Sequence, residues 1–126
     1  MLDGFKVYNL TTGLPTFSVT QNGVSFNKTA VVKMEYPEYV LLMINSNEKK
    51  IAIQACEEGQ AGATQFYKGA RGNGVISVRW NNRDLLNTIS KMMGWKLGEQ
   101  GYRIPGDYLE DDNAIIFDLS QAEAIE

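Results

Sequence analysis

Apolar and polar residues alternate over residues 16–26, on both sides of the pair Asn22 and Gly23. An Asn-Gly pair readily adopts the two positive φ values of a type I′ turn, and alternation with a period of two is typical of a strand with one buried face. The pattern therefore predicts a β-hairpin whose two-residue turn is Asn22 and Gly23.

A short helix and a second hairpin are predicted to follow. Asn27 occupies a helix N-cap position, and residues 28–35 place apolar side chains on one face before Pro37 ends the helix. Residues 39–45 are apolar on both faces, which is typical of a strand buried on both sides, and after a polar turn residues 51–54 return as its partner strand. Together with the first hairpin, these segments make one unit of hairpin, helix and hairpin.

The same order of elements recurs after a predicted linker at residues 56–63, a stretch rich in Glu and Gly. A second Asn-Gly pair, at residues 73 and 74, predicts another hairpin tip. Asn81 is the predicted cap of a helix over residues 82–93, and Gly94 fits its C-terminal end. The apolar residues of this helix recur at helical spacing. They are Leu85, Leu86, Ile89, Met92 and Met93.

The last hairpin is predicted over residues 102–119, with its first strand interrupted at Pro105 and Gly106. Residues 5–10 are expected to add a strand at an edge of the sheet. The tail from Ser120 onward is expected to be helical or frayed.

These elements predict an α+β fold in a single domain over residues 1–126. Two β-hairpin–helix–β-hairpin units, at about residues 16–55 and 64–119, would form a small, mostly antiparallel β-barrel with pseudo-twofold symmetry. A chain of 126 residues is long enough to bury a core of this kind without disulfides or a metal.

The stretch from residues 22–28 through 51–53 resembles the swapped-hairpin repeat of AbrB-like transcription regulators. In that family a short strand runs into a short helix, and a strand–turn–strand with a final aliphatic strand follows. Val24 stands where the family often has Arg, and Asn27 stands where it often has Pro. Two such units in one chain are similar to the tandem, MraZ-like members. The resemblance implies a DNA-binding regulator.

The composition excludes most catalytic and metal-binding classes. The chain has no His and one Cys, so a His-based triad, a Cys–His dyad and a Cys/His zinc site are excluded. We therefore expect no enzyme activity, no cofactor and no metal. The start of the chain has no basic segment followed by an apolar run, and no stretch is apolar enough to span a bilayer. Together with the solitary Cys56, this predicts a cytoplasmic protein without membrane contact.

Charge is distributed very unevenly, although the formal net charge is only −3. Residues 1–63 carry a net charge of −1, residues 64–104 a net charge of +5 and residues 105–126 a net charge of −7. The middle segment therefore contains the best candidate surface for an anionic partner.

Four cations of this segment are the candidate nucleic-acid-binding residues, namely Lys68, Arg71, Arg79 and Arg83. Lys68 and Arg71 are expected at the second hairpin tip, with Arg79 and Arg83 near the following strand–helix junction. Cations bind backbone phosphates and a nearby aromatic side chain can contact a base, so duplex DNA is a possible partner.

Two other interpretations remain open at this point. The basic residues could instead pair with the acidic tail, which would neutralise them. Alternatively, the protein could be a non-catalytic interaction or assembly module, self-associating through an edge strand near residues 5–10.

Overall fold

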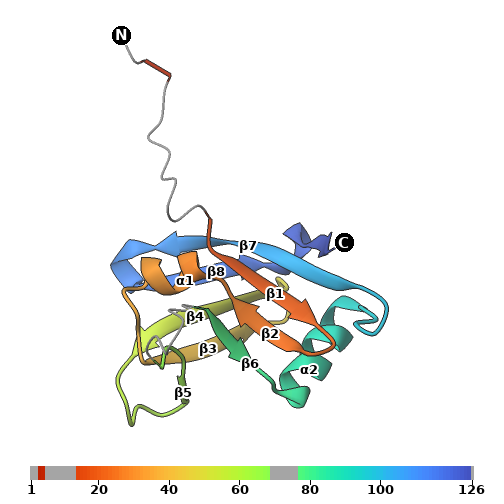
Figure 1. The fold of residues 1–126 in the computed structure, drawn as a ribbon, viewed down its shortest axis with the longest axis horizontal. Coiled ribbons are helices and arrows are strands. Elements are labelled where there is room, and N and C mark those ends of the chain that lie inside the picture. The colour runs from red at the N-terminus through yellow and green to blue at the C-terminus, as the bar shows by residue number, and fades with distance from the viewer. Residues whose placement is uncertain (1–2, 5–13, 69–76, 126) are drawn as a thin grey trace.

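The computed structural model describes residues 3–4, 14–68 and 77–125. Over these residues the fold is α+β, with two α-helices and a nine-stranded antiparallel sheet that curls into a half-barrel (Figure 1). The strand order is β5-β3-β4-β8-β7-β1-β2-β6, and β9 pairs with β7. The strands are β1 (Thr16–Thr20), β2 (Gly23–Phe26), β3 (Tyr39–Asn45), β4 (Lys50–Cys56), β5 (Ala63–Gln65), β6 (Val78–Trp80), β7 (Gly101–Leu109), β8 (Ala114–Asp118) and β9 (Glu123–Ile125).

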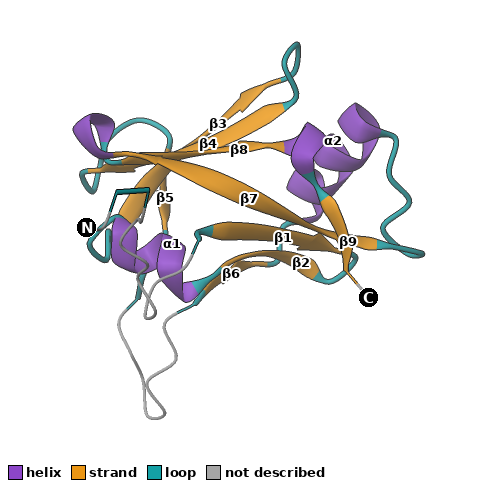
Figure 2. Cartoon of the chain, turned by 90° about the horizontal axis from the view of Figure 1, so that it is seen from above, coloured by secondary structure: helices purple, strands orange, loops and turns teal. Residues whose placement is uncertain are grey.

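The sheet folds over on itself in two layers (Figure 2). Strands β3, β4 and β8 form one layer and β1, β2 and β6 form the other, while β7 runs between them and pairs with both β8 and β1. The helices α1 (Lys28–Lys33) and α2 (Arg83–Met93) lie at opposite ends of the sheet. Two 3₁₀ turns complete the described elements, η1 (Glu110–Asp112) and η2 (Leu119–Gln121).

The first hairpin is confirmed, but its predicted turn is wrong. Thr20 pairs with Gly23, so the two connecting residues are Gln21 and Asn22, and Asn22 has no positive φ. Gly23 is the first residue of β2, with φ 141°. A Cβ atom there would lie 2.6 Å from the Trp80 carbonyl oxygen of β6, so glycine is required by the approach of a distant strand.

Both helices are confirmed, with small changes at their ends. Asn27 caps α1, and its side-chain oxygen accepts hydrogen bonds from the amides of Ala30 and Thr16, each at 3.0 Å. The cap of α2 is Asn82 rather than the predicted Asn81, because the Asn82 oxygen accepts from the Leu85 amide at 2.9 Å. Gly94 ends α2 in the left-handed conformation, as predicted.

The hairpins β3–β4 and β7–β8 are confirmed, but β7 is not interrupted, and β3 is not buried on both sides, since its last three residues are exposed. Thr16 of β1 pairs with Pro105, and Gly106 begins the pairing with β8. Pro105 therefore lies where the pairing of β7 passes from β1 to β8. At this position its missing N–H interrupts neither ladder of hydrogen bonds. A Cβ on Gly106 would lie 2.5 Å from the Phe117 ring, so this glycine lets β7 pass directly over a buried aromatic side chain.

The ends of the second half also differ from expectation. Strand β5 begins at Ala63, within the predicted linker, and pairs with β3. The tail from Ser120 onward begins in the 3₁₀ turn η2, but it then forms β9, which pairs with β7, where a helical or frayed tail was predicted. The predicted strand at residues 5–10 and the predicted tip at residues 73 and 74 lie outside the described residues.

The core lies between the two layers and is centred on three phenylalanines. The ring centroid of Phe17 lies 5.0 Å from that of Phe26 and 5.4 Å from that of Phe117. Along β1, β2, β4 and β8, alternate side chains are fully buried on this inner side. The residues between them consequently face outward, and they carry the surface chemistry of each layer.

Candidate nucleic-acid interface

A row of polar side chains crosses the outer face of the layer that contains β1, β2 and β6. Arg103 of β7 pairs with Ser18 of β1, Ser18 pairs with Ser25 of β2, and Ser25 pairs with Arg79 of β6. Directly opposite residues of neighbouring antiparallel strands share one face of the sheet. Two exposed arginines therefore flank two half-buried serines on one surface, which we call the arginine–serine row.

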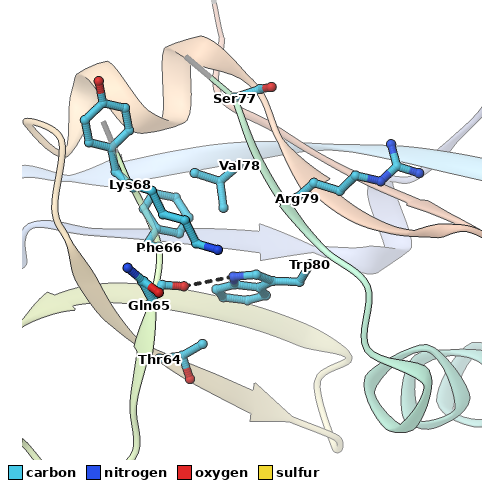
Figure 3. A pocket seen from close by; sticks show the side chains of 9 residues that line it. Thr64, Gln65, Phe66, Lys68, Ser77, Val78, Arg79 and Trp80 are labelled. Atoms are coloured by element: carbon cyan, nitrogen blue, oxygen red, sulfur yellow. Dashed lines mark hydrogen bonds between the residues drawn. The ribbon is translucent and has the colours of Figure 1, made fainter. Parts of the chain in front are cut away.

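The row faces outward because its sequence neighbours face inward. Phe17 and Val19 flank Ser18, Val24 and Phe26 flank Ser25, and all four are at most 1% exposed. The Arg79 side chain also extends away from Gln65 and Trp80 (Figure 3). Guanidinium and hydroxyl groups are the donors that proteins use to contact phosphate oxygens, so this surface can bind an anionic backbone.

Lys68 and Arg79, two of the predicted site residues, lie beside the same pockets. Both line a pocket of about 360 Å³ between β5 and β6 and a second one of about 380 Å³ further along the same gap. In the first pocket, the Lys68 side chain extends across the opening toward Trp80 (Figure 3). The structure therefore brings these two cations to one region, although only Arg79 belongs to the arginine–serine row.

Arg83 and Arg71 have different outcomes. Arg83 is the first residue of α2 and lines a separate pocket with Gln21 and Leu86, so it does not join Lys68 at the β5–β6 gap. Arg71 lies outside the described residues.

Arg103 belongs to the arginine–serine row but was not among the predicted site residues. Its neighbours Tyr102 and Ile104 are apolar, and this alternation of apolar and charged residues indicates that Arg103 faces outward. Its place opposite Ser18, however, depends on the pairing of β7 with β1, more than 80 residues apart in the sequence. Local patterns contain no signal for that contact.

Trp80 is fixed beside the candidate surface by contacts on several sides. Its indole N–H donates a hydrogen bond to the Gln65 carbonyl oxygen at 3.0 Å (Figure 3). Its ring packs edge-on against Phe26 and Phe66, with centroid distances of 5.2 and 6.1 Å. These contacts connect the end of β5 to β6 through a side chain instead of a strand pairing.

The acidic tail does not neutralise the described candidate cations. Over residues 3–4, 14–68 and 77–125, the only ion pair within 4.0 Å joins Lys50 and Glu48, at 3.3 Å. The Asp118 carboxylate accepts hydrogen bonds from the hydroxyl and the backbone amide of Ser120. Both lower the pKa of Asp118, and the hydroxyl has the larger effect. The interpretation in which Lys68, Arg79 and Arg83 pair with the tail is therefore not supported for this part of the chain.

Two further features of the described residues bear on metal binding and on membranes. Among them, no three His, Cys, Asp or Glu residues come close enough together to hold a metal ion. None of the helices found there has the length and apolar character needed to cross a bilayer.

Comparison with protein-family models, with curated proteins and with solved structures found no match to this chain.

Proposed function

We propose that this protein is a small cytoplasmic DNA-binding regulator of the AbrB-like, swapped-hairpin type. The arginine–serine row carries the proposal, because it places two exposed arginines and two hydroxyl groups on one continuous face. No acidic residue lies within that row of four.

The exchange of strands between the two halves of the chain, β1–β4 and β5–β8, supports the swapped-hairpin arrangement. The first strand of each half pairs with the other half, β1 with β7 and β5 with β3. The last strands of the halves, β4 and β8, pair with each other, as do β2 and β6. Two interleaved hairpin units related by a twofold axis would give this set of pairings.

The register of β2 and β6 supports the same symmetry. Val24 pairs with Trp80 and Phe26 pairs with Val78, with Ser25 and Arg79 as the central pair. Rotation about this centre exchanges Val24 with Val78 and Phe26 with Trp80. The two halves would then correspond at this strand with an offset of 54 residues, three more than the spacing of the two Asn-Gly pairs.

The dimensions of the row suit a DNA duplex. Arg79 and Arg103 are separated by three strand spacings, or about 14 Å along the sheet. The major groove of B-DNA is about 12 Å wide, so the two guanidinium groups can reach phosphates on either side of a groove. We therefore expect contacts mainly with the phosphate backbone and a steep dependence of affinity on salt.

Anisotropy titration of a labelled duplex at several salt concentrations tests this proposal. We expect Arg79→Ala and Arg103→Ala each to weaken binding and to reduce the slope of log affinity against log salt by about one. Lys33→Ala is the matched control, since Lys33 is an exposed cation on α1 outside the row. Absence of duplex binding at low salt, or equal losses for all three variants, would refute the proposed interface.

A non-catalytic interaction or assembly module is the second candidate function, and the opposite layer favours it. On the outer face of β3, β4 and β8, Met43 pairs with Ala52, and Ala52 pairs with Ile116. Met43 is 41% exposed, Ala52 and Ile116 are half-buried, and adjoining apolar side chains that solvent can reach are typical of interaction surfaces. Light scattering over a range of concentrations tests for self-association, which Met43→Asp would reduce and the exposed control Gln21→Asp would not.

A further inference from the structure

The gap between β5 and β6 is the place where the curled sheet fails to close. These strands end the sheet order, and over the described residues no pairing joins them. The gap is lined by consecutive residues on both sides, 64–68 from the β5 side and 77–80 from the β6 side (Figure 3). We call this site the seam groove.

The corresponding strands of the first half are closed. Strands β1 and β2 pair over four residue positions, from Phe17 opposite Phe26 to Thr20 opposite Gly23. In the seam groove, by contrast, a pocket of about 360 Å³ takes the place of such pairing. Among the described residues, no strand pairs with the edges of β5 and β6 that face the groove, and such unpaired edges are sites at which a further strand can add.

One hydrogen bond within the groove replaces a hydrogen bond that a neighbouring strand would normally make. The Gln65 carbonyl oxygen is directed toward β6 and accepts from the Trp80 indole N–H at 3.0 Å. A side-chain donor thus satisfies an edge carbonyl that would accept from a backbone N–H in a paired sheet. An incoming strand can supply that N–H and replace the indole.

Charge and polarity indicate what kind of strand fits. The described residues that line the groove and the adjoining 380 Å³ pocket include no Asp or Glu, and their charged members are Lys68 and Arg79. Apolar side chains are supplied by Phe66, Val78 and Trp80 in the groove and by Leu42 and Leu85 beyond it.

We propose that the seam groove binds an extended acidic segment of a partner protein by β-strand addition. The segment's backbone pairs with the edges of β5 and β6, its apolar side chains contact Phe66 and Trp80, and an alternate acidic side chain lies beside the Lys68 ammonium. This site shares only Arg79 with the arginine–serine row. Peptide binding therefore does not depend on DNA binding.

An acidic peptide fits the groove better than a single-stranded nucleic acid. Main-chain edges border both sides of the groove, and they complement a peptide backbone, which offers a donor and an acceptor at each residue. A nucleic acid strand carries a charge on every nucleotide, whereas Lys68 is the one cation that extends across the described pocket (Figure 3).

Nuclear magnetic resonance of the ¹⁵N-labelled protein tests the proposal. The probe is a capped six-residue peptide that alternates Val and Glu. We expect saturable shifts of the amide signals of residues 64–68 and 77–80, and a shift of the Trp80 indole N–H signal as it leaves the Gln65 carbonyl. The same peptide with alternate N-methylated residues retains its charge but loses its donors, so we expect its affinity to fall about tenfold or more.

Variants and a competing probe decide between the alternatives. Lys68→Glu is expected to weaken the Val-Glu peptide about tenfold, whereas Lys33→Glu, at an exposed lysine on α1, leaves its affinity unchanged. Equal binding of the N-methylated peptide would overturn strand addition. Shifts confined to other residues would overturn the location, and binding of oligothymidine but not of peptide would assign the groove to nucleic acid.

Discussion

The two layers of the curled sheet present opposite chemistry to the outside. The outer face of β7, β1, β2 and β6 carries Arg103, Ser18, Ser25 and Arg79 in one row. The row on β3, β4 and β8 is apolar, with Met43 opposite Ala52 and Ala52 opposite Ile116, and it ends at the exposed Asp107 of β7, opposite Ile116. Inside, the two layers are alike, since both contribute fully buried phenylalanine side chains to one core.

This difference separates what folding requires from what it leaves free. The inner positions of both layers must be apolar, because they meet in a single core. Folding places no such demand on the outer positions, so the arginines of one layer and the apolar side chains of the other need a separate explanation. We propose that the two faces bind different partners.

The largest expected effect comes from breaking the strand shared by the two layers. Gly106→Ala places a Cβ atom 2.5 Å from the buried Phe117 ring and 2.6 Å from Ile115, so we expect a loss of about 2–3 kcal/mol in the free energy of unfolding. Urea denaturation measures this loss. Gly98→Ala is the matched control, because its nearest neighbour would be a Gln21 side-chain atom at 3.8 Å, and we expect almost no change.

Equal stability of the Gly106→Ala and Gly98→Ala variants would contradict the close approach of β7 to the Phe117 ring at Gly106.

Local signals predicted most elements of the fold but not their contacts. The alternation around Asn22 predicted the first hairpin, and Asn27 was correctly predicted as a cap. The reason for Gly23 was wrong, because the Trp80 carbonyl oxygen that requires it comes from a strand 57 residues further along the chain. Strand β9 was missed because it is three residues long and is held by its pairing with β7.

The candidate surface was predictable only in part for the same reason. A local concentration of positive charge identified Lys68 and Arg79, which the structure places beside shared pockets. Arg103 joins the arginine–serine row through the pairing of β7 with β1, which no local pattern records. Arg83 was grouped with Arg79 on sequence proximity, but the turn into α2 directs it to another pocket.

A smaller effect should distinguish the two helix caps, one in each half. The Asn27 side chain accepts from two amides and donates to the Leu14 carbonyl oxygen, whereas Asn82 accepts from the Leu85 amide. We therefore expect Asn27→Ala to cost about 2 kcal/mol and Asn82→Ala about 1 kcal/mol. Thermal or urea unfolding of the two variants measures the difference, and a larger loss for Asn82→Ala would contradict this ranking.

Substitutions on the two outer faces should change binding without changing stability. We expect Arg79→Ala and Met43→Gln each to alter the free energy of unfolding by less than about 0.5 kcal/mol, since both side chains are exposed. Met43→Gln should reduce the fluorescence of an apolar dye bound to the native protein, whereas Arg79→Ala should not. Equal dye binding by both variants would show that the faces do not differ in apolar character.

The smallest expected effect concerns pH and lies at the end of β8. Hydrogen bonds from Ser120 lower the pKa of Asp118 in the folded state, so its carboxylate stabilises the fold above the unfolded pKa of about 3.9. This contribution is lost as the pH falls through the folded pKa. For this half-buried, solvent-accessible group we expect Asp118→Asn to cost a few tenths of a kcal/mol at pH 7 and less below about pH 4. A cost that grows on acidification would contradict the assignment.

The most direct test of the central claim is the salt dependence of duplex DNA binding by the double variant Arg79→Ala and Arg103→Ala. If the arginine–serine row contacts two phosphates, the slope of log affinity against log salt should fall by about two relative to the unchanged protein. Thermal unfolding should show that the variant remains folded. An unchanged slope, or an original protein that binds no duplex at low salt, would contradict the assignment of this face to DNA.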